Sequence, residues 1–224
     1  MKAVIVGGGS IDPDWASGLF YDNDTSGHPA AEKTLVIAAD RGLLFLDSIG
    51  IVPDLVMGDF DSLPEGYAGR WQRLHPDAVV ERFPPEKDYT DTELAARAAA
   101  KRGCDEIEFI GVTGRRLDHT IGAIGTLALL LETGVKAAVL DPHNRITLHK
   151  EPFSLQRAKQ WGKYVSFFAW GGDVTGLTLT GFRYPLDGFT LTGTGCLTVS
   201  NEITEETAHV SFSSGLLLMV EARD

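Results

Sequence analysis

Two aspartates stand directly after a short apolar run, and their spacing suits metal binding. Residues 55–57 are Leu, Val and Met, Gly58 follows, and Asp59 and Asp61 come next with one residue between them. Side chains two positions apart in an extended segment point the same way, so we expect the two carboxylates to lie side by side. A hard cation such as Mg²⁺, which prefers oxygen ligands, would relieve the repulsion between them. A solvated turn, in which aspartate is common, explains the same residues without a metal.

A second group of charged residues surrounds a predicted helix start in the segment EKDYTDTELA. Thr90 and Glu93 fit a capping box, and Asp91 falls in the first turn, where the helix dipole favours an anion. Capping explains Thr90 and Glu93 fully, but it does not require Lys87 or Asp88 just ahead of them. A helix start that carries Lys87, Asp88 and Asp91 could instead supply a metal ligand and a phosphate contact.

The segment GVTGRRLDHT is a glycine-containing turn between a predicted strand and a predicted helix. Its backbone N–H groups near Thr113 could hold a phosphate, and Arg115 and Arg116 could add charge-assisted contacts. Asp118 and His119 could equally be ordinary first-turn residues. The segment lacks the Lys-Ser/Thr ending of a P-loop, and the N-terminal GGGSID lacks the last glycine of the dinucleotide-binding pattern. We therefore expect neither a nicotinamide nor a flavin cofactor.

Alternating strand-like and helix-like runs must position these side chains. Apolar strands separated by helices predict an α/β domain with a mainly parallel sheet covered on both faces. Ligands bind such sheets at the carboxyl ends of the strands, so we expect Asp40, Asp59, Asp61 and Thr113 at one edge. The predicted strands cover 2–7, 34–40, 53–59, 106–112 and 136–141, and the predicted helices cover 42–50, 91–103 and 117–134. Residues 21–33 have turn composition and predict a surface loop.

The pattern changes near residue 145, where short β-like runs rich in threonine replace the alternation. These runs predict an all-β sandwich. We therefore predict two domains, an α/β domain over residues 1–143 and a C-terminal β-sandwich over residues 144–224. The expected strands lie within 163–170, 177–182, 189–195, 196–201 and 208–220.

Composition narrows the classes of function. The formal net charge of −11 argues against non-specific binding to nucleic acid or to anionic membranes. No apolar run approaches the roughly 20 residues that span a bilayer, and the N-terminus turns polar too early for a signal peptide. The two cysteines, Cys104 and Cys196, lie far apart and form no metal-type pair. These features predict a reduced, cytoplasmic protein with no nucleic-acid or membrane partner.

Taken in order, the motifs resemble those of the thiamine pyrophosphokinase (thiamine diphosphokinase) family across essentially the whole chain. Gly-Asp-Phe-Asp-Ser followed by Lys-Asp-x-Thr-Asp is highly specific as a pair, whereas either half alone is weak. The matching segments are AADRG (38–42), PDLVMGDFDS (53–62), EKDYTDTELA (86–95), GVTGRRLDHT (111–120), SNEI (200–203) and VSFSSGLLLMV (210–220). The sequence departs from the family pattern at Arg115, where we expect a second glycine, and at Gly122 and Ala123, where we expect Ala-Asn.

The resemblance implies an α/β domain, a β-sandwich and a specific reaction. The diphosphate group of ATP would pass to the hydroxyethyl oxygen of thiamine, giving thiamine diphosphate and AMP. It also implies a homodimer, with thiamine bound where the α/β domain of one subunit meets the sandwich of the other.

The same resemblance assigns roles to individual residues. Mg²⁺ would be held by Asp59, Asp61 and Asp91. The catalytic residues would be Asp59, Asp61, Asp88 and Asp91. The nucleotide-binding residues would be Asp40, Lys87, Thr90, Thr113, Arg116, Asp118 and His119. The matching positions for thiamine contact are Ser200 and Asn201.

Three alternatives stay open at the level of the sequence. A related pyrophosphokinase could act on another alcohol such as 6-hydroxymethyl-dihydropterin, because its ATP-handling motifs would look similar. A non-catalytic thiamine- or nucleotide-binding protein could keep the fold, although a pure binder needs no set of three aspartates. Simple phosphoryl transfer would yield ADP in place of AMP. Which aspartate accepts the alcohol proton is also open between Asp59, Asp61 and Asp88.

Overall fold

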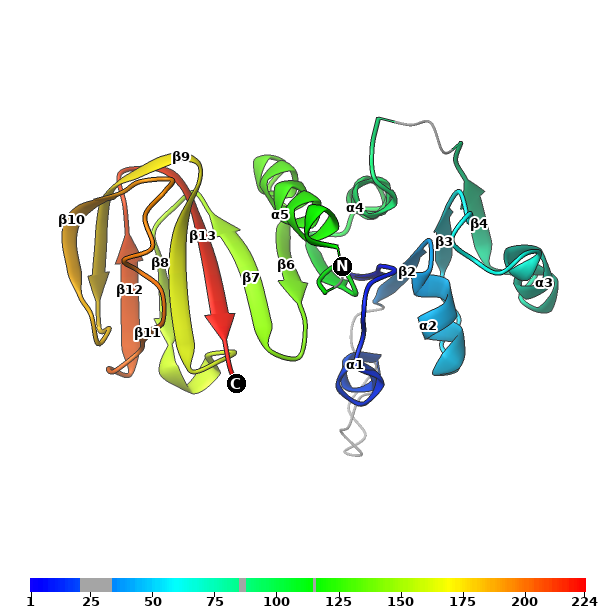
Figure 1. The fold of residues 1–224 in the computed structure, drawn as a ribbon, viewed down its shortest axis with the longest axis horizontal. Coiled ribbons are helices and arrows are strands. Elements are labelled where there is room, and N and C mark those ends of the chain that lie inside the picture. Colours follow the sequence, from blue (N-terminus) through cyan, green and yellow to red (C-terminus); the bar gives the residue numbers. More distant parts are fainter. Residues whose placement is uncertain (21–33, 85–87, 115) are drawn as a thin grey trace. The chain divides into compact units, whose positions relative to one another are not determined.

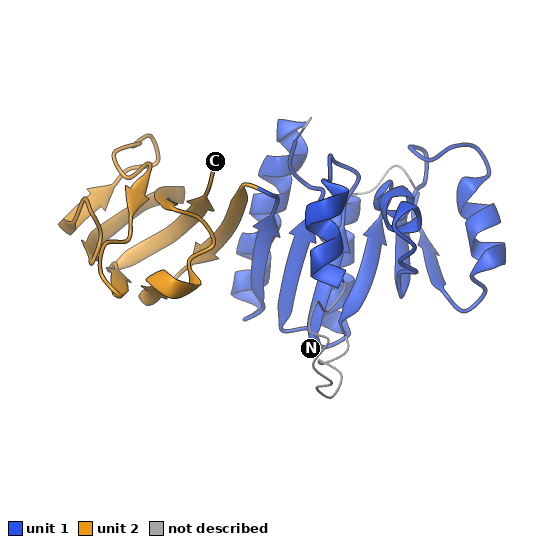
Figure 2. Ribbon diagram, turned by 90° about the horizontal axis from the view of Figure 1, so that it is seen from below, with its two compact units in different colours: residues 1–142 blue, residues 143–224 orange. Residues whose placement is uncertain are grey.

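The computed structural model describes residues 1–20, 34–84, 88–114 and 116–224 (Figure 1). The chain divides into two compact units, Met1–Pro142 and His143–Asp224, which we call unit 1 and unit 2 (Figure 2). The division falls one residue before the boundary predicted from the sequence. The expected surface loop over 21–33, together with Lys87 and Arg115, lies outside the described residues.

Unit 1 is built on a parallel sheet with the strand order β4-β3-β2-β1-β5-β6. Its central strands are almost entirely buried, which explains why they are near-continuous runs of Val, Ile, Ala and Leu. The strands are β1 (Lys2–Val6), β2 (Leu35–Ala39), β3 (Leu55–Gly58), β4 (Val79–Arg82), β5 (Glu106–Ile110) and β6 (Lys136–Leu140).

Helices lie on both faces of this sheet, as the sequence predicts for a parallel arrangement (Figure 1). Helices α4 and α5 pack beside each other, and α2 packs on β1 and β2. The helices are α1 (Pro13–Phe20), α2 (Gly42–Ser48), α3 (Tyr67–Leu74), α4 (Asp91–Lys101) and α5 (Leu117–Glu132). Within the described ranges, no helix combines the length and the apolar character that a membrane crossing requires.

Three elements of unit 1 have no counterpart in the sequence-based prediction, namely α1, α3 and β4. Strand β4 lies at the edge of the described sheet, and none of its four residues is buried. Its sequence, Val-Val-Glu-Arg, therefore lacks the apolar continuity by which the central strands were recognised.

Unit 2 is largely β, and its described strands pair in antiparallel fashion. The long strand β9 (Tyr164–Thr180) organises it. The first half of β9 pairs with β13 and β11, and the second half pairs with β12 and β10. The other elements are β7 (Asn144–His149), β8 (Phe153–Gln156), a 3₁₀ turn (Arg157–Lys159), β10 (Leu186–Leu191), β11 (Asn201–Glu202), β12 (Thr207–Ser211) and β13 (Ser214–Ala222).

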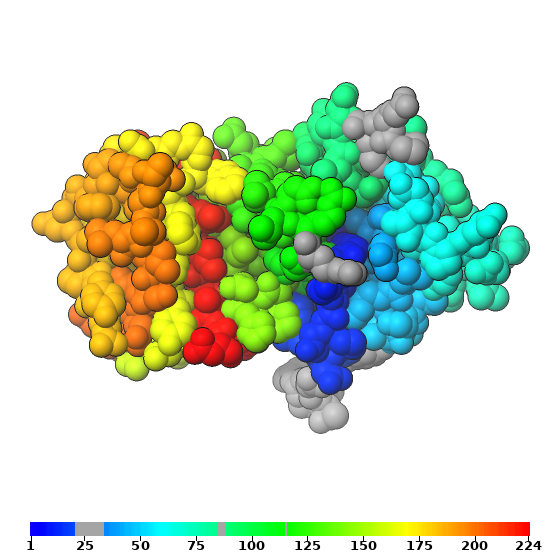
Figure 3. Space-filling view, viewed as in Figure 1, coloured from blue at the N-terminus to red at the C-terminus, as the bar shows by residue number. Residues whose placement is uncertain are grey.

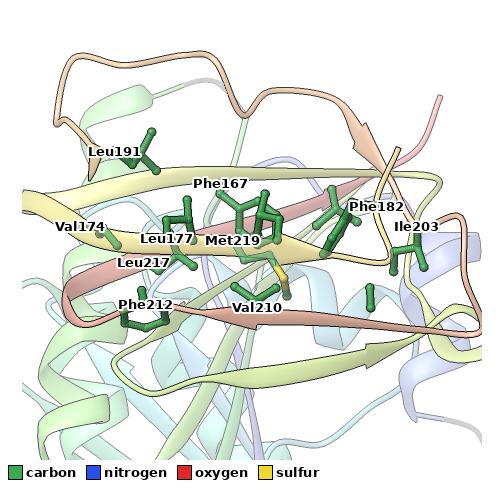
Figure 4. Close-up of a cluster of buried hydrophobic side chains, with 13 residues drawn as sticks. Phe167, Val174, Leu177, Phe182, Leu191, Ile203, Val210, Phe212, Leu217 and Met219 are labelled. Carbon is green, nitrogen blue, oxygen red and sulfur yellow. The ribbon is translucent and has the colours of Figure 1, made fainter. Parts of the chain in front are cut away.

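The core of unit 2 is formed by side chains from both halves of β9 and from their partner strands (Figure 4). Phe167 comes from the first half and Leu177 from the second, and both are fully buried. The ring of Phe167 meets that of Phe182 edge to face, with centroids 5.7 Å apart. Val210 of β12 and Met219 of β13 belong to the same cluster. Unit 2 therefore has a hydrophobic core of its own.

The expectation of a strand over residues 196–201 is wrong, because this segment is a turn that reaches β11 only at Asn201. Leu197 and Val199 are exposed, whereas Thr198 is buried and donates its hydroxyl hydrogen bond to the carbonyl of Phe167. The alternation of exposed and buried side chains is therefore that of a turn, which the hydrogen bond of the buried Thr198 fixes in place. The expected strands over 163–170 and 177–182 fall largely within the single strand β9, which begins at Tyr164 and ends at Thr180.

Candidate functional site

The described part of unit 1 contains a cavity of about 500 Å³ at the carboxyl ends of the strands. It lies where the chain, having moved outward from β1 to β4, returns to β5 on the other side of β1. Such switch points are the usual ligand sites of open parallel sheets. The lining residues are Gly8, Gly9, Ala39, Asp40, Arg41, Ser62, Thr90, Asp91, Thr92, Gly111, Val112, Thr113, Arg116 and His119. Six predicted site residues are thus brought together here, namely Asp40, Thr90, Asp91, Thr113, Arg116 and His119.

Two glycine-containing loops, after β1 and after β5, form one wall of this cavity. The backbone N–H of Gly9 donates to the carbonyl of Gly111 at 2.6 Å. A Cβ at Gly9 would lie 2.6 Å from that oxygen and 2.7 Å from the carbonyl oxygen of Thr113, closer than any side chain allows. Sequence reasoning assigned no role to Gly8 and Gly9, although a glycine run directly after a first strand was the signal for them.

Three carboxylates meet beside the cavity. Ligand oxygens of Asp40, Asp59 and Asp61 all lie within 4.8 Å of one another. They come from the loops that follow the neighbouring parallel strands β2 and β3. The donor set, three carboxylates from partly buried and exposed positions, suits a hard divalent cation.

The convergence has a different cause from the one expected, because residues 59–61 are not extended. Phe60 adopts a left-handed conformation with φ of 65°, and the N–H of Asp61 donates to Oδ1 of Asp59 at 3.1 Å. The ring of Phe60 is buried, and the guanidinium of Arg82 lies 4.9 Å from its centroid. The two aspartate side chains therefore converge because of a turn at Phe60, whose ring is buried, and not because they share one face of a strand.

Asp40 is the electrostatic centre of the cluster. Burial is the largest cause of the raised pKa of its carboxyl, and the charges of Asp91, Asp59 and Asp61 raise this pKa further. The hydroxyl of Ser62 donates a hydrogen bond to Oδ2 of Asp40, and this bond lowers the pKa of the carboxyl. Oδ1 of Asp40 is buried and has no hydrogen-bond partner among the described residues. A buried acceptor without a donor, surrounded by like charges, is the environment that a bound cation would satisfy.

Thr90 and Asp91 enter the site from the start of α4. As predicted, Thr90 is the N-cap, and its hydroxyl oxygen accepts from the N–H of Glu93 at 3.2 Å. The carboxylate of Glu93 is bound by the side chain of Arg97 at 2.8 Å and 3.0 Å, so it does not play the reciprocal role expected of a capping box. The cap sets the direction of α4 and places Asp91 in its first turn, facing the cavity.

Arg116 lines the cavity from the start of α5, and an ion pair holds its guanidinium. Its Nε and Nη2 donate to the carboxylate of Asp118 at 3.1 Å and 2.5 Å. These hydrogen bonds are the main reason that the pKa of Asp118 is lowered to about 2. Asp118 therefore lies at the cavity margin, bound to Arg116. The first turns of α5 are at the surface of unit 1 (Figure 3), where Leu117 is exposed.

The remaining predicted residues lie elsewhere. Asp88 is exposed and does not line the cavity, and Ala123 is buried in α5 as a packing residue. Ser200 and Asn201 belong to unit 2. The side chain of Asn201 is buried, accepting from the N–H of Tyr184 at 3.0 Å and donating to its carbonyl at 2.8 Å. Ser200 is exposed and left-handed, with φ of 60°.

A switch-point cavity with glycine loops on one side and converging carboxylates on another is typical of enzymes that bind a phosphorylated ligand together with a divalent cation. Comparison with known proteins narrows this class. Residues 28–139 match the model for the thiamin pyrophosphokinase catalytic domain, and residues 152–217 match that for the thiamin pyrophosphokinase vitamin B1 binding domain. The chain belongs to the thiamin pyrophosphokinase family.

Individual relatives agree with the family models. The thiamine pyrophosphokinase of Bacillus subtilis (strain 168) is 36% identical over 194 residues, covering 86% of this chain and 89% of the relative. A crystal structure of thiamine pyrophosphokinase from Bacillus subtilis has a TM-score of 0.85 at 32% identity, with 100% of both chains covered. A structure from Geobacillus thermodenitrificans has a TM-score of 0.82 at 32% identity, covering 100% of this chain and 98% of that one.

Proposed function

We propose that this protein is a thiamine diphosphokinase, which transfers the diphosphate group of ATP to the hydroxyethyl oxygen of thiamine and yields thiamine diphosphate and AMP. The observation that carries the proposal is the convergence of Asp40, Asp59 and Asp61 beside a cavity at the switch point of unit 1. These residues fall inside the region that matches the catalytic domain of the family. A binding module has no need of such a costly cluster of like charges.

A divalent cation, Mg²⁺ by the preference of the donor set, is the cofactor that we propose for this site. Asp59, Asp61 and Asp91 would hold it, and the buried oxygen of Asp40 supports adding that residue to the set. When bound, the cation neutralises polyphosphate charge and makes the attacked phosphorus more electrophilic.

Backbone amides and basic side chains of the cavity would bind and orient ATP. The backbone amides of the loop at Gly8 and Gly9, and those near Thr113 at the start of α5, suit phosphate oxygens. Two arginines line the cavity, Arg41 and Arg116. We propose that Arg116 contacts the polyphosphate, together with His119. Binding of an anion there would compete with Asp118 for the guanidinium of Arg116. This arrangement fits a reaction in which positioning and charge neutralisation dominate the barrier.

Proton transfer requires an acceptor near the attacking alcohol. Asp59, Asp61 and Asp88 are the candidates proposed from the sequence. Asp59 and Asp61 lie in the cluster, whereas Asp88 is exposed outside the cavity lining. This placement favours one of the first two.

For unit 2 we propose the role of a β-sandwich that binds thiamine and forms the dimer, in a cytoplasmic homodimer. The support is its match to a vitamin B1 binding domain and its independent core. Ser200 is the better candidate for thiamine contact, because both polar groups of the Asn201 side chain already bind the backbone of Tyr184. If sites are shared between subunits, mixing inactive Asp59→Asn and Ser200→Trp variants restores activity in the mixed dimer. Mixtures that stay inactive, or a monomer in sedimentation equilibrium, would contradict a shared site.

The reaction itself is tested by product analysis. The full chain is incubated with ATP and Mg²⁺ in the presence of thiamine, of 6-hydroxymethyl-dihydropterin, or of neither. Of the three incubations, we expect AMP and thiamine diphosphate only in the one that contains thiamine. AMP formed only with the pterin identifies the related pyrophosphokinase, ADP identifies simple phosphoryl transfer, and no turnover with any alcohol identifies a binding protein.

A further inference from the structure

Ser62 connects the two loops that supply the carboxylate cluster. It lies in the turn after β3, next to Asp61, and it is exposed at the cavity wall. Its hydroxyl donates to Oδ2 of Asp40, which lies 22 positions earlier in the chain and follows β2. The backbone of Asp40 is also held across the sheet, because its N–H donates to the carbonyl of Met57 at 2.8 Å.

These contacts leave the Asp40 side chain with one defined orientation. Its backbone is left-handed, with φ of 51°, and is anchored to β3 through Met57. The hydroxyl of Ser62 occupies Oδ2, so Oδ1 is the oxygen that is buried without a hydrogen-bond partner in the described part of the chain. An acceptor that the fold buries and leaves unbonded is available for a cation.

Repulsion from the neighbouring carboxylates makes such an anchor necessary. Ligand oxygens of Asp59 and Asp61 lie within 4.8 Å of those of Asp40. Among the described residues, no lysine, arginine or histidine side chain is bonded to the Asp40 carboxylate. Without a donor on Oδ2, the Asp40 side chain could reduce the repulsion by rotating away from the other two. A donated hydroxyl hydrogen bond opposes that rotation without adding a charge.

We propose that Ser62 is a positioning residue for the cation site, acting through Asp40 and not through contact with ATP or thiamine. The hydroxyl fixes the Asp40 carboxylate so that its free oxygen completes the ligand set with Asp59 and Asp61. The inference takes from the proposed function that this cluster is a cation site. What it adds is an effect of Ser62 on the affinity for the cation and not on the reaction. Outer-shell hydrogen bonds to metal-binding carboxylates typically change metal affinity by about 10- to 100-fold.

The direct test measures the binding of Mn²⁺ to the full chain in the absence of nucleotide. Electron paramagnetic resonance gives the concentration of free Mn²⁺, and the Kd follows from it. We expect Ser62→Ala to raise the Kd for Mn²⁺ by about 10-fold or more. Ser62→Thr, which keeps the hydroxyl, should recover most of the affinity. Ser48→Ala is the matched control, because Ser48 is also exposed and its hydroxyl donates to the local carbonyl of Phe45 in α2. Asp59→Asn shows whether the bound Mn²⁺ is in this cluster.

Kinetics gives a second, independent measurement. In Ser62→Ala the concentration of Mg²⁺ needed for half-maximal turnover should rise, with kcat largely recovered at saturating Mg²⁺. An unchanged Kd for Mn²⁺ with a raised KM for ATP would overturn the proposal, because Ser62 would then contact substrate. Unaltered Mn²⁺ binding in Asp59→Asn would overturn the site and the role of Ser62 together. If the wild-type chain forms no AMP while Ser62→Ala still weakens Mn²⁺ binding, the proposed function fails and the positioning role stands.

Discussion

His149 in β7 should make unit 2 less stable as the pH falls. Burial, and then the charge of Arg145, lower the pKa of His149 from 6.5 to about 4. The ring stacks on Phe153 with centroids 3.8 Å apart, and Nε2 lies 2.9 Å from the hydroxyl oxygen of Thr147. Because the folded pKa is below the unfolded one, the unfolded chain binds the extra proton between pH 6.5 and 4. The stabilisation is therefore complete above pH 6.5 and is lost progressively down to pH 4.

The size of the effect follows from the shift. A difference of about 2.5 pKa units corresponds to about 3 kcal/mol in full, and about 2 kcal/mol of it should be lost between pH 7 and pH 5. The assay is urea unfolding of the full chain at both pH values, for the wild type and for His149→Gln, which removes the titrating ring. Between pH 7 and pH 5, the free energy of unfolding should fall by about 2 kcal/mol more in the wild type than in His149→Gln.

A matched control and a direct measurement accompany the assay. His209→Gln removes an exposed histidine of β12 that pairs with Ser154, and it controls for the loss of a histidine ring from unit 2. Nuclear magnetic resonance titration of the His149 ring measures its pKa in the folded protein. Equal pH dependence in the wild type and His149→Gln, or a ring that titrates near 6.5, would refute the reasoning.

Three further predictions concern the site and its supports. Asp59→Asn, Asp61→Asn and Asp91→Asn should each lower turnover at least ~100-fold with an unchanged circular dichroism spectrum, and near-normal turnover in all three would remove the metal assignment. Thr90→Ala removes the cap of α4 and should cost about 1 kcal/mol in urea unfolding, whereas Thr90→Ser should cost little. Gly42→Ala should cost about 3 kcal/mol or prevent folding, since its Cβ would lie 1.9 Å from the carbonyl oxygen of Val6; Gly69→Ala, in open space on α3, is the control.

The parallel sheet of unit 1 was predictable because its strands are buried on both faces. Burial on both faces selects uninterrupted apolar residues, as in 3–6 and 55–57. Helices α2, α4 and α5 are each followed by a glycine with positive φ, at Gly50, Gly103 and Gly134. The same principle explains the failures. Strand β4 is half-exposed at the edge of the described sheet, and its short mixed sequence carries no such pattern. In unit 2, residues 196–200 alternate like a strand, but the buried hydroxyl of Thr198 binds the backbone of Phe167 and fixes a turn.

For the candidate site, the sequence predicted which loops come together but not how their side chains are oriented. The motifs located the loops after β2 and β3 and the start of α4, because their aspartates follow predicted strands or begin a predicted helix. The left-handed backbone of Asp40 and Phe60 could not be read from it, because neither residue type requires positive φ. The roles of Gly8, Gly9 and Ser62 depend on contacts with residues far along the chain, which spacing alone does not show.

The register of two neighbouring strands finally decides whether the carboxylates can meet. Ala39 of β2 pairs with Met57 of β3, so the next residues, Asp40 and Gly58, lie opposite each other. A Cβ at Gly58 would lie 3.2 Å from Cα of Asp40 and 3.3 Å from the ring of Phe60, and would push apart the two loops. The glycine of the motif therefore has a role that local turn chemistry does not give it. It lets the loop after β2 approach the loop after β3 closely enough for Asp40 to join Asp59 and Asp61.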